Sequence, residues 1–253
     1  MADANPARRV LGCFPHPDDE IFAAGLLAWC ADHGAEVHLL CATRGERGVD
    51  RRGLLPSGAE LAVWRSGELA AACAALGIAP PAFAELADGG VGNADRAAAV
   101  ALVGDHLARL RPAVVVSLGP DGAYGHRDHL AWTTIVETAV RALPPDQAPR
   151  LLHAVFPRGH FARLYELGRR TGAVAELDPA QLGVDPDQVE LRLDVRTLAE
   201  RKLAACRAHD SQLDVTPGSF FRRLYAPLLE EEWFVVAHGA PLPAGAGDPF
   251  AGL

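Results

Sequence analysis

The chain has 253 residues, of which 49% are hydrophobic and 22% are charged, and its formal net charge is −8. This balance is typical of a globular protein with a sizeable core. The excess of negative charge argues against a nucleic-acid-binding surface, which usually needs a basic stripe.

The cysteines and the lengths of the apolar runs indicate a cytoplasmic protein. Five cysteines occur without any CxxC spacing, and several lie inside apolar runs, so we expect reduced, buried thiols rather than disulfides. Met1–Arg9 lacks the apolar segment of a secretory signal, and no apolar run approaches the ~18 residues of a membrane span. We expect no membrane partner, and the sequence leaves open whether the chain forms a homo-oligomer.

Short apolar runs alternate with longer helical patterns along the chain. In chain order we predict a strand at Arg8–Phe14, a helix at Ile21–Gly34, a strand at Glu36–Thr43, a helix at Ala59–Leu76 that stops at Gly77, a strand at Ala82–Leu86, a helix at Ala94–Leu110, a strand at Pro112–Leu118, a helix at Asp128–Ala142, strands at Arg150–Phe156 and Gln188–Val195, a helix at Thr197–His209 and a strand at Trp233–Ala237.

This alternation predicts one α/β domain over residues 1–253, with a mostly parallel, Rossmann-like sheet and helices on both faces. The apolar run Val114–Val116 is typical of a strand that is covered on both faces. Residues 178–187, rich in Asp and Pro, are expected to form a surface connection, and the Gly- and Pro-rich tail 239–253 is expected to be loosely held.

A dense group of ionisable side chains follows the first predicted strand, in the sequence HPDDE of residues 16–20. Ligand sites of open α/β sheets gather at the carboxyl ends of the strands, and a divalent cation would remove the repulsion between clustered carboxylates. His16 and Asp19 could supply a nitrogen and an oxygen ligand to zinc, which would leave Asp18 free to act on a water beside the metal. The alternative is a polar turn in which an aspartate caps the helix and His16 is merely exposed.

A second group of ionisable side chains follows the Val-rich strand, in the sequence YGHRDH of residues 124–129. His126 and His129 are three residues apart at the start of a predicted helix, so their rings should lie close together. Either histidine could complete a His/Asp/His metal set with the first group. The alternative is that Asp128 caps the helix and both histidines are solvated.

Together these motifs resemble the LmbE-like family of de-N-acetylases, which includes the GlcNAc-phosphatidylinositol (PIG-L) deacetylases and the mycothiol and bacillithiol pathway deacetylases. The two motifs above are the specific part of the resemblance. Weaker matches extend it over most of the chain, at Thr43-Arg44-Gly45-Glu46, Arg65-x-x-Glu68, and Lys202 with His209-x-Ser211-Gln212. The segment after the GHxDH motif is shorter than in the larger mycothiol-type enzymes.

The resemblance implies a Zn²⁺ site formed by His16, Asp19 and His129, with Asp18 as the general base. Fe²⁺ would also suit this ligand set. The resemblance also implies that His126 stabilises the oxyanion and protonates the leaving amine, and that Asp128 orients His126 and raises its pKa.

Four further side chains are assigned less directly. Tyr124 is similar in placement to a tyrosine that lines the active site of relatives, and Arg65 and Asp88 fall where the family contacts its substrate. Arg44 could also contact substrate, although a charged turn with an internal ion pair explains it equally well. For His209, at the end of a helix near Lys202, we expect a purely structural role.

The predicted function is therefore a metal-dependent hydrolase that removes an N-acyl group, expected to be N-acetyl, from an amino sugar or amino-sugar conjugate, with a metal-bound water as nucleophile. A metal-dependent phosphoesterase is the alternative enzyme, although a set of two histidines and one aspartate favours zinc over magnesium. A non-catalytic sugar-binding relative is the third hypothesis, but such a protein would have no use for Asp18.

Overall fold

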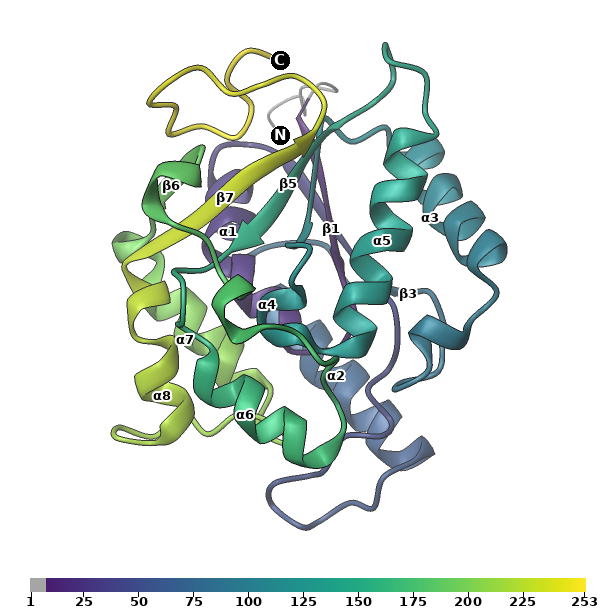
Figure 1. Cartoon of the computed structure of the whole chain (residues 1–253), viewed down its shortest axis with the longest axis vertical. Helices are drawn as coiled ribbons and strands as arrows, with labels where there is room; N and C mark the ends of the chain where they lie inside the picture. Colours follow the sequence, from purple (N-terminus) through teal and green to yellow (C-terminus); the bar gives the residue numbers. More distant parts are fainter. Residues whose placement is uncertain (1–7) are drawn as a thin grey trace.

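A seven-stranded sheet forms the centre of the protein (Figure 1), in a computed structural model that describes residues 8–253. The strand order is β3-β2-β1-β4-β5-β7-β6. Strands β1 to β5 pair in parallel, and β7 runs antiparallel to both of its neighbours, so the predicted mostly parallel sheet is confirmed. The strands are β1 (Arg9–Phe14), β2 (Glu36–Cys41), β3 (Ala82–Phe83), β4 (Val114–Leu118), β5 (Arg150–Val155), β6 (Leu191–Asp194) and β7 (Glu231–His238).

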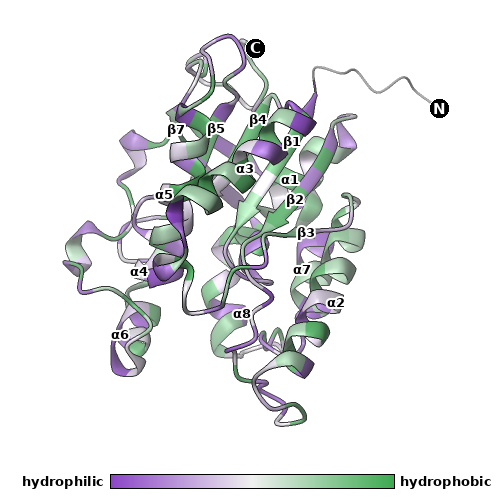
Figure 2. Cartoon of the chain, turned by 90° about the vertical axis from the view of Figure 1, so that its right-hand side faces the viewer, coloured by the Kyte–Doolittle hydropathy of each residue, from purple (hydrophilic) through white to green (hydrophobic). Residues whose placement is uncertain are grey.

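Two layers of helices cover the sheet, because alternate strand residues face opposite sides. On β4, Val115 belongs to the apolar cluster beneath α3 (Arg96–Leu110) and α5 (Arg127–Arg141). Its neighbours Val114 and Val116 belong to the cluster beneath α1 (Ala24–Asp32), α2 (Ala59–Leu76) and α7 (Ala199–Ala208). Figure 2 shows the hydrophobic strands between these two layers. No helix among residues 8–253 combines the length and hydrophobicity that crossing a bilayer would need.

The predicted helices form, with shifts at their ends that have local causes. Asp95 caps α3 by accepting hydrogen bonds from the N–H groups of Ala97 and Ala98, so the helix begins after the predicted start at Ala94. Gly77 ends α2 in a left-handed conformation with φ 73°, as predicted. The helix predicted from Ile21 begins instead as a 3₁₀ turn at Asp19–Ala23 and becomes α-helical at Ala24.

Three helices were not predicted: α4 (Gly122–Gly125), α6 (Ala162–Thr171) and α8 (Phe220–Tyr225). Two of them are too short to show a helical period. The ten-residue α6 is mostly polar, and Tyr165 is its one buried residue.

The tail 239–253, which the sequence predicts to be loosely held, makes contacts with β5 at several points. The guanidinium of Arg150, a fully buried residue on β5, donates hydrogen bonds to the carbonyl oxygens of Ala240 (2.7 Å), Pro241 (2.9 Å) and Pro249 (2.7 Å). Phe250 is also buried. A buried cation needs acceptors, and the tail supplies them.

A buried ion pair joins α7 to the start of α1. The ammonium of Lys202 contacts the carboxylate of Glu232 on β7, and their side chains are 0% and 1% exposed. The same carboxylate accepts hydrogen bonds from the N–H groups of Gly25 (2.7 Å) and Leu26 (2.8 Å) in the first turn of α1. A negative charge is stabilising at this end of a helix.

The order of the strands determines where a site can form. Strands β2 and β3 lie on one side of β1, and β4 and all later strands lie on the other side. The carboxyl ends of β1 and β4 therefore flank the crevice at the topological switch point, where open α/β sheets bind ligands. Both polar groups predicted from the sequence follow these two strands.

Candidate metal centre and active site

The three predicted metal ligands lie around one point at the switch point. His16 Nδ1 is 3.0 Å from Asp19 Oδ2 and 3.3 Å from His129 Nε2, and His129 Nε2 is 3.2 Å from the same Asp19 oxygen. Tetrahedral donor atoms at about 2 Å from a zinc ion lie roughly 3.3 Å apart. The donor set and its spacing therefore fit zinc.

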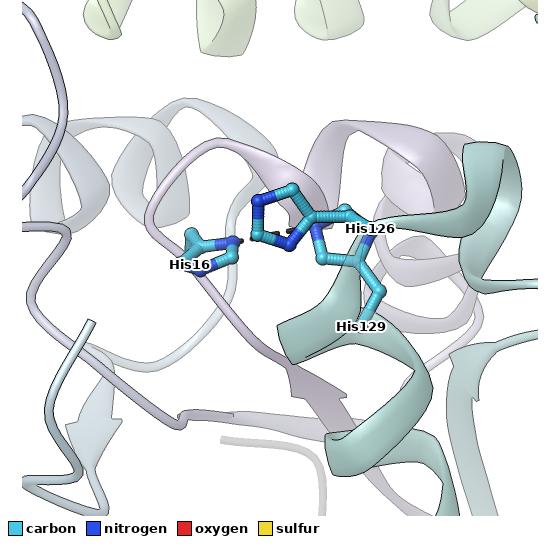
Figure 3. A group of neighbouring side chains, drawn as sticks. All are labelled: His16, His126 and His129. Carbon is cyan, nitrogen blue, oxygen red and sulfur yellow. Dashed lines mark hydrogen bonds between the residues drawn. The ribbon is translucent and has the colours of Figure 1, made fainter. Parts of the chain in front are cut away.

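His126 lies beside this triad (Figure 3), where the ring of His16, from the loop after β1, meets the rings of His126 and His129 at the start of α5. Nitrogen atoms of His16, His126 and His129 all lie within 4.8 Å of one another, and so do donor atoms of His16, Asp88 and Asp128. The triad of His16, Asp19 and His129 shares His16 with both groups, and its three donor atoms lie within 3.3 Å of one another.

Hydrogen bonds leave one nitrogen of each triad histidine directed at Asp19. His129 Nδ1 is 3.0 Å from the carbonyl oxygen of Gly122, so Nε2 is free of a proton in the neutral ring. His16 Nε2 lies 3.3 Å from Asp128 Oδ2 and 3.2 Å from Asp88 Oδ1, which leaves Nδ1 as its donor. Such outer partners fix the tautomer and orientation of metal-binding histidines.

The charges of the triad are consistent with a cation site. Burial alone would raise the pKa of Asp19, but His129 and His16 hold it well below its usual range. Burial alone would lower the pKa of His16, but Asp128, Asp19 and Asp88 raise it well above its usual range. The buried carboxylates thus need positive charge, which the histidines supply when protonated and a metal ion would supply when bound.

Asp18 stands next to the triad in a backbone conformation that aspartate rarely adopts. Its φ is 112°, and a residue in such a region costs of order 1–3 kcal/mol. Burial raises the pKa of Asp18 to about 6, despite the opposing charge of Arg65. An Arg65 nitrogen lies 3.2 Å from Asp18 Oδ1. A carboxylate with this pKa can both accept and release a proton near neutral pH.

The structure corrects two expectations about His126. The carboxylate of Asp128 contacts His16 and accepts hydrogen bonds from the N–H groups of Gly89 (2.6 Å) and Val91 (3.2 Å), so it does not orient His126. Only the backbone N–H of Asp128 contacts His126, donating to Nδ1 at 3.3 Å. The pKa of His126 is not raised but lowered to about 3, first by burial and then by the other two histidines. Because Nδ1 accepts this hydrogen bond, a neutral His126 ring carries its proton on Nε2.

A cavity of about 470 Å³ opens onto these groups. Its lining includes His16, Asp18, Asp19, Tyr124 and His126, together with Arg65, Asp88 and Asp128. Burial raises the pKa of Tyr124 well above its usual range, so this hydroxyl keeps its proton. The cavity brings together all but two of the ten side chains selected from the sequence.

The two remaining side chains differ in their placement. His129 is buried within the triad and does not line the cavity. Arg44 lies outside the cavity lining, because its guanidinium pairs with Glu85 at 2.5 Å, donates to Ser66 at 2.9 Å and stacks over Phe83. Arg44 therefore does not line the cavity, and its ion pair is not internal to the charged turn of residues 43–48 but reaches Glu85, just after β3.

Arg65 and Asp88 line the cavity but already have protein partners. Arg65 is 4% exposed and donates to the carbonyl oxygens of Gly45 (2.8 Å) and Pro17 (2.5 Å), as well as facing Asp18. Asp88 faces His16 and accepts a hydrogen bond from the N–H of Arg47 at 2.8 Å. Both side chains therefore support the metal and base residues directly.

The sequence did not mark Arg47 and Arg127, which line the same cavity. Both are exposed, and within residues 8–253 neither guanidinium has an ion-pair or hydrogen-bond partner. Residues 171–173, at the end of the unpredicted α6, also line the cavity. The position of Arg127 inside the GHxDH motif was the one available signal.

Residues 11–140 match the family model described as PIG-L: GlcNAc-PI de-N-acetylase. The chain belongs to the PIG-L family. This PIG-L protein is 34% identical to a 1D-myo-inositol 2-acetamido-2-deoxy-alpha-D-glucopyranoside deacetylase of Nakamurella multipartita, over 97% of this chain and 94% of the relative. The predicted family and enzyme class, an N-deacetylase, are confirmed.

Solved structures share the fold at lower identity. The N,N'-diacetylchitobiose deacetylase of Pyrococcus horikoshii has a TM-score of 0.63 and 22% identity, over 93% of this PIG-L protein and 87% of that chain. GalB, a 4-carboxy-2-hydroxymuconate hydratase of Pseudomonas putida KT2440, has a TM-score of 0.67 and 18% identity, over 94% and 100%. At these identities the likeness shows the fold alone, and a hydratase among the neighbours shows that this fold serves more than one reaction.

Proposed function

We propose that this PIG-L protein removes the N-acetyl group from a 2-acetamido sugar joined to a small polyol, with N-acetylglucosaminyl-inositol as the first substrate to test. The named activity of the Nakamurella multipartita relative supports this choice of substrate, because the alignment spans nearly the whole of both chains. The cavity volume of about 470 Å³ lies within the range of small-molecule sites, about 300–1,000 Å³.

His16, Asp19 and His129 are proposed to hold Zn²⁺, and Fe²⁺ would suit the same donors. The bound metal would lower the pKa of a water and polarise the amide carbonyl. The observation that carries the proposal is the convergence of these three donors within 3.3 Å, beside an aspartate that is not among them.

Asp18 is proposed to accept the proton of the attacking water. Its raised pKa suits it to pass the same proton to the amine nitrogen as the C–N bond breaks, which releases acetate and the free amino sugar. Arg65 holds one oxygen of Asp18, so the other oxygen is the one available to the water.

His126 is proposed to stabilise the negative charge that develops on the carbonyl oxygen. The lowered pKa of His126 favours donation of a hydrogen bond from neutral Nε2–H, rather than the protonation of the amine that the resemblance implied. Tyr124 is proposed as a second neutral donor on the cavity wall, and Asp88 as a contact for sugar hydroxyls through the part of its carboxylate that faces the cavity.

The test is acetate release from N-acetylglucosaminyl-inositol by purified, zinc-loaded protein, with Asp18→Asn as the decisive variant. We expect kcat to fall by about 10²–10⁴-fold, because asparagine cannot accept the proton of the water. Zinc content should stay at the wild-type level, because Asp18 is not a proposed ligand.

Asp194→Asn, a change to an exposed aspartate on β6, is the matched control and should leave kcat unchanged. Removal of the metal with a chelator should abolish acetate release, and zinc should restore it. Full activity of Asp18→Asn, or turnover by metal-free protein, would contradict the proposal. Phosphate release from phosphoesters without acetate release would favour the phosphoesterase alternative.

A further inference from the structure

In the segment His209-x-Ser211-Gln212, just beyond α7, Gln212 lines the cavity, whereas His209 and Ser211 have no part in the function described so far. The first residue of this segment makes a short contact deep in the protein: His209 Nε2 lies 2.6 Å from Glu20 Oε1, and both side chains are 0% exposed. Glu20 is the last residue of the HPDDE motif, and it lies 189 positions away in the sequence. This buried contact therefore links the HPDDE motif to the motif that begins at His209.

The second oxygen of Glu20 contacts the backbone of Asp18. Glu20 Oε2 accepts a hydrogen bond from the Asp18 N–H at 3.1 Å. Asp18 is the residue with φ 112°, so the carboxylate holds the peptide group of a strained residue. Because Glu20 is only two residues away, it can restrain Asp18 only if its own carboxylate is anchored elsewhere, and His209 is that anchor.

The same segment also supports the element that holds the side chain of Asp18. Ser211 donates to Glu68 through its N–H (2.8 Å) and its hydroxyl (2.6 Å). Glu68 lies on α2, one turn after Arg65, whose guanidinium faces Asp18 Oδ1. Residues 209–211 therefore contact Glu20, which binds the backbone of Asp18, and Glu68 on α2, the helix whose Arg65 faces the side chain of Asp18.

We propose that Glu20 and His209 are positioning residues that fix the backbone of Asp18, so that its carboxylate faces the cavity. The proposal rests on the proposed role of Asp18 as the base. It replaces the purely structural role expected for His209, which would make this pair equivalent to any other buried ion pair of the fold.

The test compares His209→Leu with His209→Gln in zinc-loaded protein. Leucine removes the donor to Glu20, whereas the glutamine amide can still donate. For His209→Leu we expect kcat for acetate release to fall 10–100-fold with KM and zinc content unchanged, because a shift of about 1 Å in a reacting group can cost about 10²-fold. His209→Gln should recover kcat to within about threefold of wild type.

Lys202→Met is the matched control. Lys202 lies on α7, the helix that ends just before His209; it is equally buried and pairs with a carboxylate, but it has no link to Asp18. It should lower the thermal midpoint and leave kcat per folded molecule unchanged. If His209→Leu also leaves kcat unchanged, or if its kcat falls no further than that of Lys202→Met, the positioning role is overturned.

Two further variants separate this proposal from the proposed function. Adding His209→Leu to Asp18→Asn should lower the residual activity no further, because the two changes act on the same group; additive losses would overturn the proposal. An active Asp18→Asn protein refutes the base assignment itself, whereas an inactive one beside a fully active His209→Leu refutes only the positioning. If His209→Leu does not fold, the double variant Glu20→Leu/His209→Leu, which removes both buried charges, takes its place with the same expected loss of kcat.

Discussion

Two buried ion pairs connect the α7 region to the chain around the start of α1, and the two pairs have different roles. Lys202 pairs with Glu232, whose carboxylate accepts hydrogen bonds from the first turn of α1. His209 pairs with Glu20, whose carboxylate accepts a hydrogen bond from Asp18. Burial lowers the pKa of His209, but Glu20 outweighs this effect and raises it. In each pair the glutamate also accepts backbone hydrogen bonds, and their donor decides the role of the pair. For Glu232 the donors are in the first turn of α1, and for Glu20 the donor is the candidate base Asp18.

The comparison predicts that the Lys202–Glu232 pair matters for stability and not for turnover. Glu232→Ala should destabilise the protein by about 3–5 kcal/mol, because it leaves a buried ammonium and two helix N–H groups without an acceptor. Urea denaturation measures this change, and the kcat of the folded protein should match the wild type. Glu230→Ala, an exposed carboxylate two positions earlier, is the control. A loss of kcat like that expected for His209→Leu would remove the distinction between the two pairs.

A smaller effect is expected at Gly25, which lets α1 approach Glu232. An added Cβ would lie 2.4 Å from Val195 Cγ1 and 2.9 Å from Glu232 Oε1. Gly25→Ala should therefore cost about 1–3 kcal/mol of stability through overpacking, with kcat retained. Gly104→Ala in α3, where an added Cβ meets nothing within 4 Å, should instead raise the urea midpoint, because alanine is the better helix former. Equal effects of the two changes would show that the approach at Gly25 is not restrictive.

The smallest effect is expected for an ion pair at the surface. Arg196 and Asp194 contact each other, but their side chains are 72% and 57% exposed. Arg196→Ala should leave the free energy of unfolding unchanged within error, both in low salt and at about 1 M salt, because water and ions screen such pairs. A clear loss of stability would mean that burial does not determine how much an ion pair of this protein contributes to the free energy of unfolding.

Much of the site followed from the sequence, because strand order and motif position together determine where side chains meet. The HPDDE segment and the GHxDH segment each follow a strand of the parallel sheet, and β1 and β4 are neighbours. His16, Asp19 and His129 therefore converge without any need to know how the loops are shaped. The continuous apolar run of β4 likewise indicated that helices cover both faces.

The errors arose where a contact depends on a segment distant in sequence. The partner of Asp128 is set by the loop after β3, whose N–H groups at Gly89 and Val91 draw the carboxylate away from His126. Glu85, just after β3, captures Arg44 in the same way. The role of residues 209–212 was invisible because their partners, Glu20 and Glu68, lie in two different elements.

The buried guanidinium of Arg150 makes the stability of the sheet depend on residues 239–253. Three carbonyl oxygens from residues 240–249 complete the coordination of that cation on β5. Proteolytic clipping after His238 would strand a positive charge beside β4, the strand that leads into the GHxDH segment. We therefore expect loss of residues 239–253 to destabilise β5 and, through its pairing with β4, the strand that precedes the candidate site.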